Sequence, residues 1–243
     1  MRGHRKGIAL CALAAILGAS APSHAIESLK GKMKPAKVEP ITNQEFSDLR
    51  NQLGACIVKN NKAKVAKYLA NSDSLTVDYN AIGSSQQMFF IYFSMDACKK
   101  VNVPQMMQPI FMTPGGLRNL LLEASYLDAE AATPQPLLNE KGEPAPSGVR
   151  AFPTKGDNLP AVMSYAVLAD CVATKDPVLA DAVLRTGFSL ADERKAAVAL
   201  APIIGGCVTE GSNVSLTPAS IRTLAAEGMW HRYANKAKTV AAK

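Results

Sequence analysis

The feature that most constrains this fold is an internal repeat. Segment 113–126 aligns with segment 217–230 without a gap, and both begin with Thr-Pro, carry Arg five residues after the Thr, and carry Glu five residues after the Arg. An undetected repeat would distort any assignment of the fold. We therefore interpret the chain as two tandem copies of one unit, residues 42–130 and 158–234.

The first 25 residues have the features of a secretory signal peptide. Basic residues come first, an apolar run from Ile8 to Leu17 follows, and the segment ends in small residues. We expect cleavage after Ala25 and export to a periplasmic or extracellular compartment. No later apolar stretch approaches the roughly 18 residues that a membrane span needs.

Removing the signal peptide leaves four cysteines, and an even number in an exported chain indicates two disulfides. Leu53-x-x-Cys56 aligns with Leu168-x-x-Cys171, and each copy has one further cysteine. Four cysteines allow three pairings, but equivalent cysteines in two copies should occupy equivalent places. The repeat therefore predicts the pairs Cys56–Cys98 and Cys171–Cys207.

Each copy is expected to contain about four helices, so the predicted class is all-α. Capping patterns mark helix starts at Thr42, Asn61, Thr113, Asp176 and Thr217. The aromatic and β-branched run 88–93 favours a strand, but the second copy favours a helix over 85–100. Residues 131–157 are rich in Pro and Gly and are expected to form a linker, while residues 26–41 and 235–243 form basic tails.

The repeated Arg and Glu are interpreted as structural ion pairs. Five residues turn a helix by about 140°, so the two side chains cannot meet along their own helix. We expect pairing across the copies, Arg118 with Glu227 and Arg222 with Glu123. The alternative is catalytic, since Glu123, Glu227 and the single histidine left in the mature chain, His231, are the candidates for a hydrolase working between the copies.

An insertion in the first copy is the predicted binding surface. The spacing from Cys98 to Thr113 is longer than that from Cys207 to Thr217, and the added residues are apolar where a loop should be polar. This loop either contacts a partner or folds back over the core. Its candidate binding residues are Met106, Met107, Phe111 and Met112.

The repeated aromatic residues Tyr126 and Trp230 are a second candidate surface. They point away from the apolar stripe of the last helix, so they either pack internally or contact a partner or the other copy.

Metal, cofactor and nucleic-acid functions are not expected. The methionines suit Cu(I), but no histidine supports such a site, and zinc sites that need two imidazoles are excluded. The basic residues gather in the tails, which favours weak attraction to anionic envelope polymers over specific nucleic-acid binding.

The sequence therefore predicts an exported, non-enzymatic helical repeat module that binds a protein or a cell-envelope component. The alternative is a small hydrolase acting in the cleft between the two copies. A deep polar cleft with a carboxylate of raised pKa would favour the enzyme, and a broad exposed apolar patch would favour the module.

Overall fold

The computed structural model describes residues 41–86, 88–101, 113–130, 132–145, 150–208 and 216–235. Within these ranges all regular structure is helical, apart from isolated bridges that join Ser72 to Val77 and Leu138 to Pro144. The predicted all-α class is confirmed. The predicted signal peptide and most of the two basic tails lie outside the described residues.

The N-terminal half, residues 42–130, begins with a long kinked helix. Helix α1 (Asn43–Ala70) starts at a capping box in which Thr42 accepts from the Glu45 amide. The sequence predicts two helices here, and they join across a kink at Asn61, the one residue of α1 with non-helical dihedrals. Helix α2 (Tyr79–Ile82) follows, and helix α5 (Pro114–Ala129) starts at Thr113 as predicted.

The segment 85–100 is helical but interrupted. A single turn of α-helix, α3 (Phe89–Tyr92), is followed by a 3₁₀ turn, η2 (Met95–Cys98). Between them Ser94 adopts a left-handed backbone with φ of 47°, which a continuous helix cannot contain. The preference for helix over strand is therefore correct, whereas the expected continuous helix is wrong.

The described residues of the C-terminal half, 158–208 and 216–234, contain four α-helices in sequence: α6 (Leu159–Lys175), α7 (Pro177–Arg185), α8 (Ala191–Gly205) and α9 (Pro218–Met229). A short 3₁₀ turn, η4 (Gly156–Asn158), precedes α6, and a π-helical turn, η5 (Trp230–Ala234), continues α9. Asp176 and Thr217 cap α7 and α9, as their sequences predict.

Two disulfides tie helices together within the halves. Cys56 of α1 is bonded to Cys98 of η2, and Cys171 of α6 is bonded to Cys207 just after α8. These are the pairings that the repeat predicts. The disulfides fit an oxidising, exported environment. None of the helices in the described ranges has the length and apolar character needed to cross a membrane.

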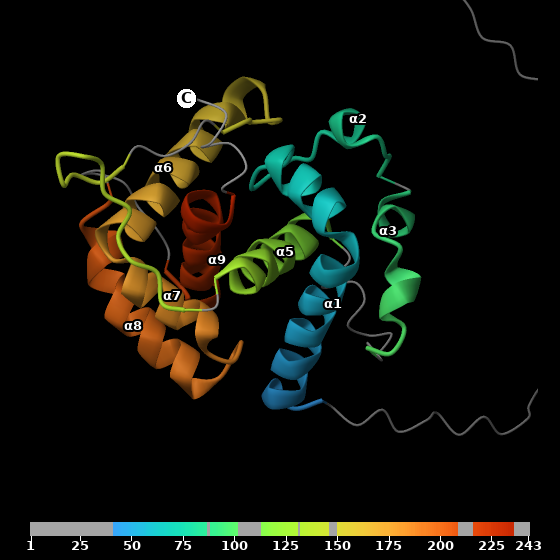
Figure 1. The fold of residues 1–243 in the computed structure, drawn as a ribbon, viewed down its shortest axis with the longest axis horizontal. Helices are drawn as coiled ribbons and strands as arrows, with labels where there is room; N and C mark the ends of the chain where they lie inside the picture. The colour runs from blue at the N-terminus through green and yellow to red at the C-terminus, as the bar shows by residue number, and fades with distance from the viewer. Residues whose placement is uncertain are drawn as a thin grey trace, which may run out of the picture. The chain divides into compact units, whose positions relative to one another are not determined.

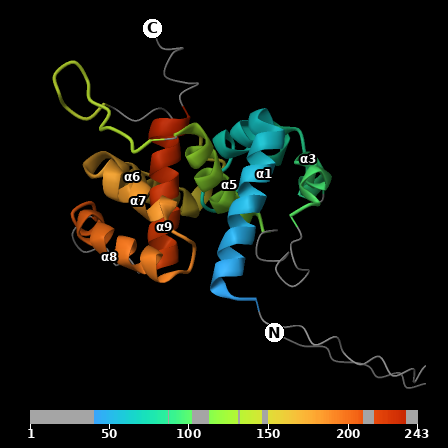
Figure 2. The same ribbon diagram turned by 60° about the horizontal axis from the view of Figure 1, so that its bottom comes forward.

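The two halves share one core. Helix α5 lies between α1 and α9, and helices α6, α7 and α8 pack around α9 (Figure 1). The same order is visible after rotation, with α3 on the outer side of α1 (Figure 2). Buried side chains from both halves, among them Ile57, Leu121, Val183 and Met229, belong to one continuous hydrophobic cluster.

The described part of the predicted linker is fixed to this core. Residues 138–144 form a turn closed by hydrogen bonds between Asn139 and Glu143, and Arg232 donates to the carbonyl of Ala145. Further on, the strap, residues 150–155, buries the side chains of Arg150 and Thr154. This segment therefore forms part of the folded body.

Candidate functional site

The repeated charges meet across the two halves, as the sequence predicts. Arg118 of α5 donates to both oxygens of Glu227 in α9, at 2.5 and 3.0 Å. Arg222 of α9 donates to both oxygens of Glu123 in α5, at 2.9 and 2.6 Å. All four side chains are buried. The central helix pair is thus joined by two reciprocal, bidentate ion pairs.

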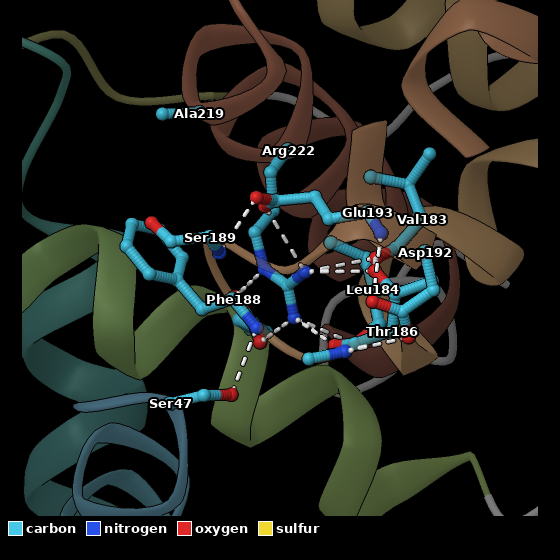
Figure 3. A network of polar contacts seen from close by, with 12 residues as sticks. Ser47, Val183, Leu184, Thr186, Phe188, Ser189, Asp192, Glu193, Ala219 and Arg222 are labelled. Carbon is cyan, nitrogen blue, oxygen red and sulfur yellow. Dashed lines mark hydrogen bonds and ion pairs between the residues drawn. The ribbon is translucent and has the colours of Figure 1, made fainter. Parts of the chain in front are cut away.

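Glu123 stands at a centre of balanced charge, the Glu123 centre, made of Arg50, Glu123, Glu193 and Arg222. Arg50 contacts Glu123 at 2.8 Å, and Glu193 contacts Arg222 at 3.2 Å. Arg222 also donates to backbone carbonyls at the end of α7, those of Val183, Leu184 and Thr186 (Figure 3).

The ring of Phe188 completes this centre. It lies 4.6 Å from the Arg50 guanidinium and 5.8 Å from that of Arg222. Ser47 accepts a hydrogen bond from the Phe188 amide and so fixes the position of the backbone that carries the ring (Figure 3). Such a cation–π arrangement stabilises two guanidinium groups that lie close together.

Glu227 stands at a different centre, the Glu227 centre, made of Arg118, Arg150, Asp170, Tyr165, Glu227, His231 and Arg232. Arg150 contacts Glu227 at 3.0 Å, and His231 lies 3.5 Å from the same oxygen. Beside them, Arg232 and Asp170 form a bidentate pair at 2.8 and 3.1 Å.

Both repeated carboxylates are held in their ionised form. Burial raises the pKa of Glu123, but Arg50 and Arg222 outweigh it, so the pKa lies below the ordinary value. Burial likewise raises the pKa of Glu227, and Arg118, Arg150 and His231 reverse the shift. A carboxyl of lowered pKa is a poor general acid near neutral pH. This electrostatic environment suits structural anions.

The predicted aromatic surface lies inside the molecule. Tyr126 and Trp230 are both almost fully buried, and the Tyr126 hydroxyl donates to Asp181 of α7 at 2.6 Å. Of the alternatives drawn from the sequence, burial agrees with internal packing, because neither side chain can reach an external partner. The candidate binding residues Met106, Met107, Phe111 and Met112 lie outside the described residues.

An open cavity lies where the strap crosses the end of α1. It has a volume of about 610 Å³ and is lined by segment 71–80, which includes the start of α2, and by the strap. We call this cavity the strap groove. Its apolar walls come from Tyr79, Phe152 and Pro153. Its polar lining includes Asn71, Asn80, Asp78 and Lys155.

One buried carboxylate holds the two walls of the strap groove together. Asp73 accepts from the amides of Leu75 and Thr76 at 2.9 and 2.8 Å. From the strap it accepts the amide and the hydroxyl of Thr154 at 2.8 and 2.9 Å. Asp73 and Thr154 are both buried. The groove therefore has a pre-formed shape.

A smaller cavity of about 300 Å³ lies between α1 and α5. Arg50 and Glu123 line one part of it, together with Leu120, Leu127 and Asp128. Its charged groups are already paired, Arg50 with Glu123 and Asp128 with Lys62.

Several residues of these sites carry no signal in the sequence. No residue of like charge is repeated in the other copy for Arg50, Arg150 or Glu193. The sequence around Asp73 does not distinguish it from other aspartates in loops. Their roles come from contacts between residues far apart in the chain. Within the described residues, no cluster of His, Cys, Asp and Glu could hold a metal ion.

Comparisons of the chain with protein-family models, with curated proteins and with solved structures return no match.

Proposed function

We propose that this protein is an exported, non-enzymatic helical module, built from two copies of one unit, that binds a protein component of the cell envelope in the strap groove. The observation that carries the proposal is the groove itself. It is open and is lined by aromatic, amide and charged residues, and its walls are joined by the hydrogen bonds between Asp73 and Thr154.

The reciprocal contacts support the two-copy architecture. Gly54 of α1 lies close to Ala124 of α5. The residues that align with them, Ala169 of α6 and Gly228 of α9, also lie close to each other. Arg118 also donates to Ser72, just after α1, much as Arg222 donates to the end of α7. One unit repeated about an approximate two-fold axis accounts for both sets of contacts.

The charges favour binding over hydrolysis. A hydrolase needs a carboxyl whose pKa is raised for proton donation, or a nucleophile beside a base. Glu123 and Glu227 have lowered pKa values and are enclosed by arginines. His231 contacts Glu227, so the three catalytic candidates of the hydrolase alternative are engaged in buried contacts.

The groove lining favours a polypeptide over an anionic polymer. Lys155 and Asp78 contribute one charge of each sign, so the lining has no excess of positive charge to attract a polyanion. Aromatic and proline side chains beside amide groups suit an uncharged stretch of polypeptide. A pre-formed groove also lowers the entropic cost of binding.

Site-specific photo-crosslinking in the native cell envelope tests the proposal. A photoreactive residue placed at Asn80 or at Lys155, both exposed in the groove lining, should give the same protein adduct. The matched control is Lys195, an exposed lysine on α8 outside the groove. It should give no such adduct.

A blocking variant completes the test. Asn80→Trp should fill part of the groove, reduce the adduct formed from Lys155 and leave the thermal midpoint within a few degrees. Equal adducts from Lys195 and Lys155, or no adduct from either groove position, would overturn the proposal.

A further inference from the structure

The two buried carboxylate centres differ in their charge balance. At the Glu123 centre two arginines face two glutamates, so the charges cancel. At the Glu227 centre Arg118 and Arg150 share the single carboxylate of Glu227, while Arg232 and Asp170 pair with each other. Among the ion pairs of the described residues, this centre therefore has one more arginine than carboxylate.

The excess charge is concentrated beside Glu227. Arg118 and Arg150 each place a guanidinium nitrogen 3.0 Å from the same Glu227 oxygen, Oε1. The Arg118 side chain is 2% exposed and that of Arg150 is 8% exposed. Two guanidinium groups thus share one carboxylate in a buried setting, where charges are weakly screened.

Two hydrogen-bond donors at this centre have no partner among the described residues. Arg150 Nη2 and Tyr165 Oη are both buried and make no hydrogen bond to that part of the chain. Burial raises the pKa of Tyr165 well above its usual range, so the phenol keeps its proton. Tyr165 lies in α6, which packs against α9, and the nearby charges of Glu227, Arg118 and Arg150 influence the pKa of its hydroxyl.

We propose that the Glu227 centre binds one small monovalent anion of the halide class, held by Arg150 Nη2 and Tyr165 Oη. Such an ion accepts a hydrogen bond from each donor and supplies the missing negative charge. A water molecule would accept the hydrogen bonds but leave the charge uncompensated. An anionic polymer cannot reach donors that are enclosed.

Thermal unfolding of the full protein at constant ionic strength tests the proposal. Replacing sodium gluconate by sodium chloride should raise the midpoint in a saturable manner, as binding to one site of the native state requires. Tyr165→Phe should weaken the chloride dependence about tenfold, which corresponds to the loss of one hydrogen bond. Arg150→Met should abolish it.

Matched variants separate this site from general effects. Tyr126→Phe removes a phenol hydroxyl elsewhere, and Arg50→Met removes an arginine of the balanced centre, so both should keep the chloride dependence. An equal midpoint in gluconate and chloride, or a full chloride effect in Arg150→Met, would contradict the proposal.

Crystals of the unmodified protein grown in bromide give a second test that needs no variant. An anomalous peak within hydrogen-bond distance of Arg150 and Tyr165 is expected. Absence of the peak would refute the halide site.

Discussion

Single buried residues connect the two halves of this molecule. Arg118 and Arg222 each bridge α5 and α9. Arg118 also donates to Ser72 just after α1, and Arg222 donates to carbonyl groups at the end of α7. A helix end carries partial negative charge, so a guanidinium is favourable there. Burial of such pairs costs desolvation, and their best-attested effect is to fix one register. These arginines therefore specify how α5 meets α9.

A double-mutant cycle measures this connection. Removing one partner alone, Arg118→Ala or Glu227→Ala, should destabilise the fold by about 3–5 kcal/mol, because a buried charge is left unpaired. The double variant should lose less than the sum of the two single changes. The measurement is the free energy of unfolding in urea.

The exposed pair Lys62–Asp128 is the matched control for this cycle. Its coupling should stay within about 1 kcal/mol. Independent, additive losses for Arg118 and Glu227 would show that the buried pair does not couple the halves.

Repetition explains which of these residues could be predicted. An Arg followed five residues later by a Glu occurs in both copies, as Arg118 with Glu123 and as Arg222 with Glu227. This repetition singles out the four residues. Arg50 aligns with Tyr165 and not with another arginine. The repeat therefore does not predict the second arginine that contacts each glutamate, which is Arg50 at Glu123 and Arg150 at Glu227. Arg150 comes from the predicted linker, and only the three-dimensional structure places it beside Glu227.

At the scale of elements, a capping residue predicts where a helix starts, but it does not predict how completely the preceding helix ends there. Asp176 and Asn61 occupy equivalent positions, and both mark a break between helices, but the helices are fully separated at Asp176 whereas they join across a kink at Asn61. Pro177 follows Asp176 and cannot donate a backbone hydrogen bond, so the helix must restart. Lys62 follows Asn61 and keeps its N–H, and the Asn61 side chain donates to the Ile57 carbonyl. The helix there kinks and continues.

Close helix packing gives a prediction for α9. A Cβ at Gly228 would lie 2.1 Å from the carbonyl oxygen of Ala169 in α6, and backbone atoms cannot move aside easily. Gly228→Ala should therefore destabilise the protein by about 1–3 kcal/mol, the usual cost of overpacking. Chemical unfolding measures this loss.

Gly115→Ala in α5 is the control for this change. Nothing lies near the added methyl group, so the substitution should be neutral or stabilise by up to about 1 kcal/mol. Equal stability of Gly228→Ala and Gly115→Ala would show that α6 and α9 do not pack as closely as described.

At the scale of the whole molecule, the described covalent cross-links lie within the halves and not between them. Joining the halves therefore depends on the shared core, the strap and the buried ion pairs. The stabilisation from hydrophobic packing in the core does not depend on protonation, whereas the ion pairs need ionised carboxylates. Acid should consequently weaken the ion pairs between the halves before it weakens the shared hydrophobic core.

The two buried glutamates determine over which pH range the free energy of unfolding falls. Glu123 and Glu227 have pKa values below the reference value of 4.5 in the native state. As the pH falls, the unfolded chain binds protons first, so these groups stabilise the fold above about pH 4.5 and lose that effect progressively below it. The free energy of unfolding in urea, measured from about pH 7 to about pH 3, should fall steeply below about pH 4.5.

Two variants identify the groups responsible. Glu45→Gln removes an exposed carboxylate whose pKa is also lowered, by the hydrogen bonds at Thr42, and most of the pH dependence should remain. Glu123→Gln with Glu227→Gln should flatten the dependence, since an amide does not titrate. If this double variant does not fold, NMR titration of the two carboxyl groups in the unmodified protein supplies the same information. An unfolding free energy that stays constant down to about pH 3 would mean that the buried carboxylates do not hold the halves together.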